Sequence, residues 1–149
     1  QPMYNLVKRQ AEVELLPMAA SEQLGVISYS PVGGGLLSGK YGPEQRPQGT
    51  RLVDNAMYAK RYGEAWGYET AASFTTLSRQ INVHPVSLAV AWAARHPAIT
   101  APIIGARNLE QLAPSLEALD VPMDAALYER ITALSRTPAP ATDRLEDIG

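Results

Sequence analysis

The chain has 149 residues, of which 46% are apolar and 19% are charged, and its formal net charge is −2. Such a chain suits about one globular domain, and its charge balance gives no reason to expect nucleic acid or an anionic membrane as a partner. The absence of cysteine excludes a disulfide framework, a thiolate nucleophile and a cysteine-ligated metal.

The chain opens with two expected strands separated by a helix. The apolar residues 3–7 and the β-forming residues 26–30 each predict a short buried strand. Between them, the apolar spacing and the glutamate and alanine content of residues 13–24 favour a helix. Pro17 restricts the first turn of that helix, and Gly25 stands where a glycine would end it.

A glycine-rich segment and three helical stretches follow. Residues 33–50 are rich in glycine and proline and predict a long loop without regular structure, of a kind that is usually functional or mobile. Residues 58–68 predict a partly helical stretch, and residues 69–80 predict a helix. Pro85 suits the first position of a further helix over residues 86–95.

A third strand and two capped helices complete the order of elements. Residues 100–104 predict the strand. Asn108 can cap a helix that runs to Leu119, and Asp124 can cap a last helix that runs to about Ser135. Because strands alternate with helices, we expect an α/β fold with parallel strands and right-handed crossovers.

Two features bear on location and processing. No apolar stretch approaches the ~20 residues of a membrane span, and no signal peptide is visible, so we expect a cytoplasmic protein. The first residue is Gln1 rather than methionine, so we expect a chain that is processed or truncated at its start.

The glycine run at residues 33–35 follows a strand and suggests a phosphate-binding loop. It is not a Rossmann fingerprint, because no third glycine follows at the required spacing. Gly34, Gly39 and Lys40 nearly match a Walker A motif, but Tyr41 replaces the hydroxyl residue that would hold Mg²⁺. A plain flexible loop is the alternative interpretation.

A sharper feature follows the strand at residues 100–104. Gly105, Arg107 and Asn108 would place backbone N–H groups and a guanidinium at a helix N-terminus, which favours binding of an anion. The carboxyl end of a strand is also where α/β proteins bind ligands. An ordinary surface arginine beside a turn is an equal alternative.

Residue spacing nominates no catalytic or metal centre. His84 and His96 each precede a proline at an expected helix boundary, which suits structural residues better than catalytic ones. No cluster of histidines and carboxylates has the spacing of metal ligands. Trp92 lies on an apolar helix face and is expected in the core.

Four segments together resemble the aldo-keto reductases, in the order and roughly the spacing of that family. They are Gln-Pro-Met-Tyr-Asn-Leu at 1–6 with Arg9, Glu-Leu-Leu-Pro at 14–17, Ser-Tyr-Ser-Pro-Val-Gly-Gly-Gly-Leu-Leu-Ser-Gly-Lys-Tyr at 28–41, and Pro-Ile-Ile-Gly-Ala-Arg-Asn at 102–108 with Gln111. The resemblance implies a (β/α)8 barrel of the TIM type. This chain would supply its C-terminal half, roughly strands 6–8, over residues 1–135, followed by a loosely packed proline-rich tail at 136–149. A full barrel takes ~250 residues, which agrees with a partial one here.

The resemblance implies NADP(H) as the cofactor. Gln1 matches a glutamine that binds the nicotinamide carboxamide, and Tyr29 matches the aromatic residue that stacks on the nicotinamide ring. Six further positions match the family's phosphate contacts: Ser30, Pro31, Val32 and Gly33 at the strand end, and Lys40 and Arg51 in the following loop. The proline, glycine and polar content of residues 46–61 suggests that this stretch becomes ordered only when the cofactor is bound.

The adenosine end of the cofactor is matched by residues that follow the third strand. Gly105, Arg107 and Gln111 match family positions there, and Arg107 is the expected partner of the 2′-phosphate, because a guanidinium suits a phosphate dianion better than a ribose hydroxyl. Where members often carry a Glu-Asn pair for the adenine, this chain has Pro114 and Ser115.

The family's catalytic Asp, Tyr, Lys and His have no matching positions here, so we expect this chain alone to be inactive. Its expected partners are the N-terminal half of the barrel, in the same or a separate chain, and a small carbonyl substrate. One alternative is an NADPH-binding regulatory subunit that resembles the channel-associated members of the family. Another is a small flavodoxin-like or Rossmann domain, which should carry a phosphate loop after the first strand, although residues 7–10 contain no glycine.

Overall fold

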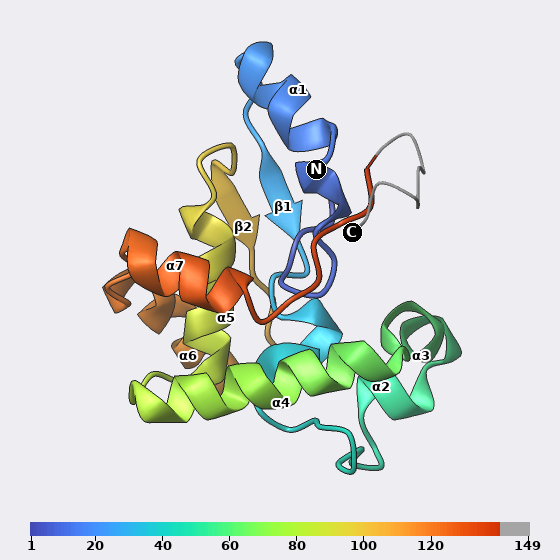
Figure 1. Cartoon of the computed structure of the whole chain (residues 1–149). Helices are drawn as coiled ribbons and strands as arrows, with labels where there is room; N and C mark the ends of the chain where they lie inside the picture. Colours follow the sequence, from blue (N-terminus) through green and yellow to red (C-terminus); the bar gives the residue numbers. More distant parts are fainter. Residues whose placement is uncertain (141–149) are drawn as a thin grey trace.

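Two short parallel strands form the sheet in a computed structural model that describes residues 1–140. Strand β1 (Ile27–Tyr29) pairs with β2 (Ala101–Ile103), and Tyr29 stands opposite Ile103 (Figure 1). The N-terminal segment lies on the other side of β1, where Met3 forms a single parallel bridge with Tyr29. The expected α/β arrangement with parallel strands is therefore confirmed for these two strands.

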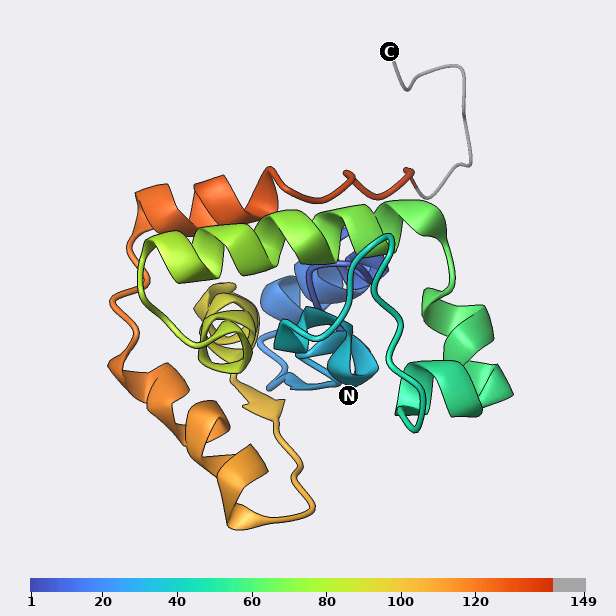
Figure 2. The ribbon, with the colours of Figure 1, turned by 90° about the horizontal axis from the view of Figure 1, so that it is seen from below.

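Helices precede, separate and follow the two strands along the chain. A 3₁₀ turn, η1, and the helix α1 precede β1, five helical elements connect β1 to β2, and three more follow β2. Their bounds are η1 (Gln10–Glu12), α1 (Leu15–Ser21), η2 (Gly33–Ser38), α2 (Arg51–Asp54), α3 (Ala56–Tyr62), α4 (Ala65–Gln80), α5 (Pro85–Arg95), α6 (Leu109–Leu116), η3 (Glu117–Asp120) and α7 (Ala125–Thr132). Seen from below, α4 crosses the molecule beside α7 (Figure 2), and the Arg130 guanidinium binds the Gln80 side chain between them.

The core centres on α5, the most apolar helix. Leu88 and Trp92 are fully buried on it. The Trp92 ring stacks between the rings of Tyr4 and Tyr128, at centroid distances of 5.1 and 5.7 Å, and its indole N–H donates to the Thr132 hydroxyl. Trp92 thus ties the N-terminal segment to α7 and is a core residue, as expected from the sequence.

The helix starts follow the expected capping chemistry. The Asn108 carboxamide accepts from the Gln111 N–H at 2.9 Å, and the Asp124 carboxylate accepts from the Leu127 N–H at 2.7 Å. These bonds satisfy backbone donors that a helix leaves unpaired in its first turn. Helix α5 starts at Pro85, as predicted.

The strand expected at residues 3–7 is wrong. Asn5 and Lys8 exchange backbone hydrogen bonds, so the segment turns back on itself after Met3. The buried Asn5 carboxamide also accepts from the Val7 N–H at 3.1 Å. A side chain that bonds its own neighbouring backbone competes with strand pairing, which explains why the apolar pattern misleads here.

Several expected boundaries also need correction. Helix α1 spans only Leu15–Ser21, and the left-handed residue after it is Gln23 (φ 55°) rather than Gly25. Helix α4 begins four residues before the expected 69. The helix after Asn108 stops at Leu116 and continues as the 3₁₀ turn η3, and α7 ends before Ser135. The glycine-rich segment is not wholly irregular, because it begins with η2.

Within residues 1–140, no helix is long and apolar enough to cross a membrane. Over the same range, no group of three or more potential His, Asp or Glu ligands gathers as a metal site. Of the expected tail at 136–149, residues 141–149 lie outside the described residues.

Candidate functional site

Three segments meet at the carboxyl edge of the sheet. The Tyr29 N–H donates to the Pro2 carbonyl at 3.0 Å, which holds Gln1 beside β1, two residues before the parallel bridge of Met3 with Tyr29. Because β2 runs parallel to β1 in register, Gly105 follows its strand at the same edge as Ser30. Gln1 and Gly105 are exposed and Tyr29 is half-buried, so all three are accessible, and Tyr29 and Gly105 lie at the same edge.

The turn after β1 closes on itself. Ser30 adopts a left-handed conformation (φ 61°), which is uncommon for a residue with a side chain. The Gly33 N–H donates to the Ser30 carbonyl at 2.9 Å, the Gly34 N–H donates to the Ser30 hydroxyl at 3.2 Å, and the Gly35 N–H donates to the Val32 carbonyl at 3.1 Å. The three glycine N–H groups are thus hydrogen-bonded within the turn. Pro31 and Gly33 are buried beneath this turn.

A buried polar cluster holds the turn from beneath. The Asn5 amide donates to the Ser30 carbonyl at 2.9 Å and to the Tyr62 hydroxyl at 3.4 Å. The Ser30 and Tyr62 hydroxyls lie 3.2 Å apart, and the Tyr62 hydroxyl also donates to the Met3 sulfur. Burial raises the pKa of Tyr62, although bonds from Ser30 and Asn5 oppose the rise. Tyr62 therefore stays protonated.

Sequence reasoning missed Asn5 and Tyr62 as part of this site. A polar residue inside an apolar run was the available signal for Asn5. No local signal marked Tyr62, because its partners Asn5 and Ser30 lie 57 and 32 positions away.

Helices α2 and α3 lie against the same turn. The Tyr58 ring packs so closely over Gly34 that a Cβ there would lie 2.7 Å from a ring carbon. The guanidinium groups of Arg51 and Arg61 lie 5.2 and 5.6 Å from the Tyr58 ring centre. Leu52 is buried and anchors α2. The expected phosphate residue Arg51 is thus held near the strand end through Tyr58, whereas Lys40 is exposed beyond η2.

Positive charge concentrates in this part of the chain. Residues 33–62 contain five basic and two acidic side chains, whereas the other residues contain eight basic and 13 acidic ones. A local excess of cations on an acidic chain is the arrangement that attracts an anionic ligand.

The second part of the edge follows β2. Arg107 and Gln111 are exposed, and the Gln111 carboxamide accepts from the Arg107 N–H at 3.3 Å. A side chain on Gly105 would meet nothing within 4 Å, so space is open beside it. Ser115 lies one turn beyond Gln111 but is only 7% exposed. The structure therefore groups Arg107 with Gln111 and does not bring the Ser115 hydroxyl to the same open surface.

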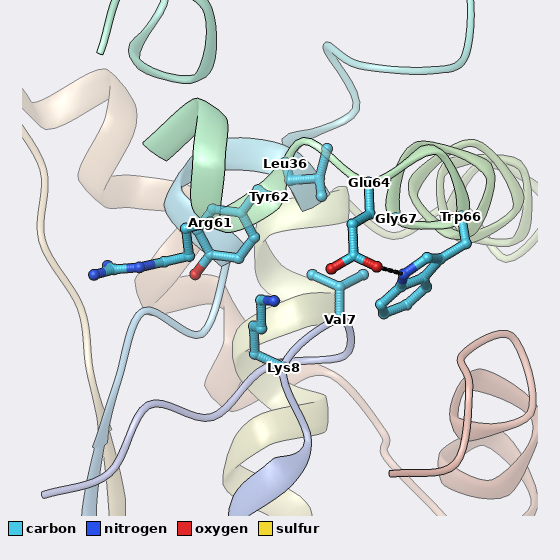
Figure 3. A pocket seen from close by; sticks show the side chains of 8 residues that line it. All are labelled: Val7, Lys8, Leu36, Arg61, Tyr62, Glu64, Trp66 and Gly67. Carbon is cyan, nitrogen blue, oxygen red and sulfur yellow. Dashed lines mark hydrogen bonds between the residues drawn. The ribbon is translucent and has the colours of Figure 1, made fainter. Parts of the chain in front are cut away.

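A small pocket borders the strand-end turn. Its walls come from the N-terminal segment, η2 and the junction of α3 with α4 (Figure 3), and are formed by Val7, Lys8, Leu36, Arg61, Tyr62, Glu64, Trp66 and Gly67. The Trp66 indole donates to the Glu64 carboxylate at 2.7 Å. Since Tyr62 lines this pocket and also contacts Ser30, the pocket and the turn share one wall.

Comparison with known proteins gives a family match. The model of the Aldo/keto reductase family matches residues 1–136. The chain is 32% identical over 142 residues to an uncharacterized oxidoreductase, YrpG, of Bacillus subtilis, and 28% identical over 145 residues to Protein tas of Escherichia coli. These matches cover 95% and 94% of this chain but 41% of each relative.

A further relative is named for a different role. The chain is 31% identical over 130 residues to a probable voltage-gated potassium channel subunit beta of Oryza sativa, covering 81% of this chain and 38% of that protein. The chain thus spans about two fifths of the length of the curated relatives that it matches.

Proposed function

Because this chain belongs to the aldo/keto reductase family, we propose that it is the cofactor-binding part of an oxidoreductase that passes hydride between NADP(H) and an aldehyde or ketone. The family resemblance inferred from the sequence motifs is confirmed by the match over residues 1–136. The use of NADP(H), the reduction of a carbonyl substrate and the supply of only part of the barrel by this chain are what we propose.

The meeting of three segments at one sheet edge carries the proposal. Tyr29 and Gly105 lie at the carboxyl ends of the two parallel strands, where barrel enzymes bind their ligands, and Gln1 lies on the segment that pairs with Tyr29. The adjoining basic segment over residues 33–62 suits a ligand with several phosphates. Arg107 is an exposed guanidinium close to open space at Gly105, which suits a terminal phosphate.

These residues fit NADP(H), and along the edge each group of them would bind a different part of the cofactor. Tyr29 would pack against the nicotinamide, with Gln1 binding its carboxamide. The Ser30 turn, Lys40 and Arg51 would lie along the pyrophosphate. Arg107 and Gln111 would bind the adenosine 2′-phosphate. When bound, the cofactor supplies the hydride, and this chain's residues orient its ring and neutralise its phosphates.

The remaining half of a barrel is the proposed partner, whether it belongs to the same or a separate chain. Large apolar side chains are exposed on three surfaces of this chain, the sheet face, α1 and α6. They are Ile27 (48% exposed) and Ile103 (39%), Leu15 (52%) and Met18 (47%), and Leu109 (81%) and Leu116 (52%). Closure of a (β/α)8 barrel would cover an open sheet edge and the helix faces beside it. That half would bring the family's catalytic residues.

Titration of the chain with NADPH, followed by nicotinamide fluorescence, tests cofactor binding. We expect saturable binding, tighter for NADPH than for NADH. Arg107→Ala should lower NADPH affinity by about tenfold, because one charge-assisted pair is lost, and should leave NADH affinity unchanged. Arg79→Ala, at an exposed position on α4, is the matched control. Absence of saturable binding, or an equal loss for both nucleotides, would contradict the proposal.

Intact mass under native and denaturing conditions tests the partner. A companion chain of comparable size, together with NADPH-dependent reduction of a simple aldehyde, would support a reductase in two pieces. A lone chain or homodimer without such activity would leave cofactor binding as the only function of this chain.

The channel-subunit relatives favour a second candidate function. Identity of 31% and 29% to probable potassium channel beta subunits of rice and Arabidopsis supports an NADPH-binding regulatory subunit as the alternative. The two candidates differ in turnover: a complete protein that binds NADPH and reduces no carbonyl compound would favour the regulatory one.

A further inference from the structure

The Ser30 turn is held in an unfavourable conformation by residues from two distant segments. A left-handed backbone costs energy for a residue with a side chain and persists only when its surroundings impose it. Here Asn5 binds the Ser30 carbonyl from the N-terminal segment, and Tyr62 contacts the Ser30 hydroxyl from α3. Both are almost completely buried, at 0% and 3% exposure.

The same contacts hold α2 and α3 in place. Tyr62 is the last residue of α3, and its ring lies 6.4 Å from that of Tyr58, which packs over Gly34. Asn55 caps α3 by accepting from the Met57 N–H at 3.1 Å. All of these contacts are made between residues of this chain, either from a side chain to the backbone or between side chains.

We propose that Tyr62 is a positioning residue that, with Asn5, locks α2 and α3 onto the Ser30 turn, so that the phosphate-binding end of β1 is shaped before the cofactor arrives. The inference rests on the proposed function for its ligand, and it contradicts the sequence-based expectation that residues 46–61 become ordered only with cofactor. Tyr62 does not itself contact the ligand. It acts by fixing Ser30 and, through Tyr58, Arg51.

Preorganisation has a measurable consequence. When the loops of a site are already ordered, binding of a ligand does not have to offset the entropy that ordering them would cost. Loss of the Tyr62 hydroxyl should therefore weaken ligands that use the Ser30 turn, and spare ligands that use only Arg107 and Gln111 at the end of β2. Adenosine 2′-monophosphate is such a ligand, because it lacks both the pyrophosphate and the nicotinamide nucleoside.

The test compares Tyr62→Phe with Tyr68→Phe in the full chain of 149 residues. Tyr68 is equally buried, and within residues 1–140 its hydroxyl forms no hydrogen bond with another side chain or the backbone. Tyr62→Phe should lower NADPH affinity about fivefold, the equivalent of one hydrogen bond, with adenosine 2′-monophosphate affinity unchanged. Tyr68→Phe should alter neither. An equal loss for both ligands, or no loss for either, would overturn the proposal.

Limited trypsin digestion without cofactor is the second measurement. In the wild type, cleavage after Arg51, Lys60 and Arg61 should be slow. It should be about fivefold faster in Tyr62→Phe, as expected for the loss of one hydrogen bond, and unchanged in Tyr68→Phe. Equal cleavage rates in all three proteins would contradict the proposal that Tyr62 holds α2 and α3 against the Ser30 turn. If the wild type binds no NADPH, the proposed function fails while the digestion still decides whether Tyr62 locks the segment.

Discussion

The Tyr4 hydroxyl donates a 2.7 Å hydrogen bond to the carboxylate of Glu12, and the Arg9 guanidinium binds both oxygens of that carboxylate at 2.9 and 2.8 Å. Tyr4 is fully buried. Burial raises its pKa strongly, and the Glu12 carboxylate raises that pKa further, so the hydroxyl stays protonated as a donor. The three residues join the start of the chain to η1, beside the Trp92 stack.

Tyr4→Phe should lower the free energy of unfolding by about 1.5–3 kcal/mol, because a bond to a charged acceptor is lost while the ring packing is kept. Urea unfolding followed by circular dichroism measures the change. Tyr68→Phe is the matched control and should cost less than about 0.5 kcal/mol, since its hydroxyl has no comparable acceptor within the described residues. Equal costs for the two variants would show that the Glu12 bond contributes nothing.

Two buried serines should respond in opposite directions to loss of their hydroxyls. Ser28 and Ser78 are both fully buried. The Ser28 hydroxyl has no hydrogen-bond partner within residues 1–140, whereas the Ser78 hydroxyl donates to the Val83 carbonyl at 2.8 Å. Ser28→Ala should therefore stabilise the chain by about 1 kcal/mol, and Ser78→Ala should destabilise it by about the same amount. Paired thermal melts test this, and destabilisation by both variants would contradict it.

Local chemistry explains which features could be predicted from the sequence. The caps at Asn108 and Asp124 and the start of α5 at Pro85 depend on residues within three positions, and all three are confirmed. The strand at 3–7 failed because Asn5 uses its side chain on Val7 and on Ser30, 25 positions away. Contacts across such separations leave no periodic pattern in the sequence.

In the candidate site, too, some features could be predicted from the sequence and others could not. Motif resemblance predicted Gln1, Tyr29 and Gly105 as site residues, and the parallel register brings Tyr29 and Gly105 to one edge, with Gln1 on the segment that pairs with Tyr29. It could not reveal that the glycine N–H groups are used within the turn, or that Tyr62 closes on Ser30, because both depend on how α3 packs against β1.

The free energy of unfolding should fall at acid pH because His96 is half-buried in its neutral form. Its Nδ1 accepts from the Ala98 N–H at 3.2 Å, and its ring meets the Tyr4 ring edge-on. Burial lowers the pKa of His96, with Arg9 adding to this and the Glu12 carboxylate opposing it. The unfolded chain therefore takes up a proton first, near pH 6.5, and the stability due to neutral His96 is lost as pH falls from there through the folded pKa.

His96→Asn is the variant that isolates this effect. An asparagine can still accept the Ala98 N–H but does not titrate, so the unfolding free energy of the variant should change less than that of the wild type between pH 7 and pH 5.5. Urea unfolding at a series of pH values measures both. Parallel curves for the two proteins would show that His96 does not carry the dependence.

Alanine substitutions at Gly34 and Gly49 distinguish the cost of backbone strain from the cost of steric contact. Both have a left-handed backbone, at φ 66° and 74°. A Cβ on Gly49 would meet nothing within 4 Å, whereas one on Gly34 would lie 2.7 Å from the Tyr58 ring. Gly49→Ala should therefore cost only the backbone term, about 1 kcal/mol, and Gly34→Ala should cost about 1–3 kcal/mol more, because Tyr58 and α3 must move. Urea unfolding gives both values, and equal costs would mean that Tyr58 does not rest on Gly34. An excess for Gly34→Ala together with faster tryptic cleavage after Lys60 would show that this glycine is required because it admits the ring that holds α3 to the strand end.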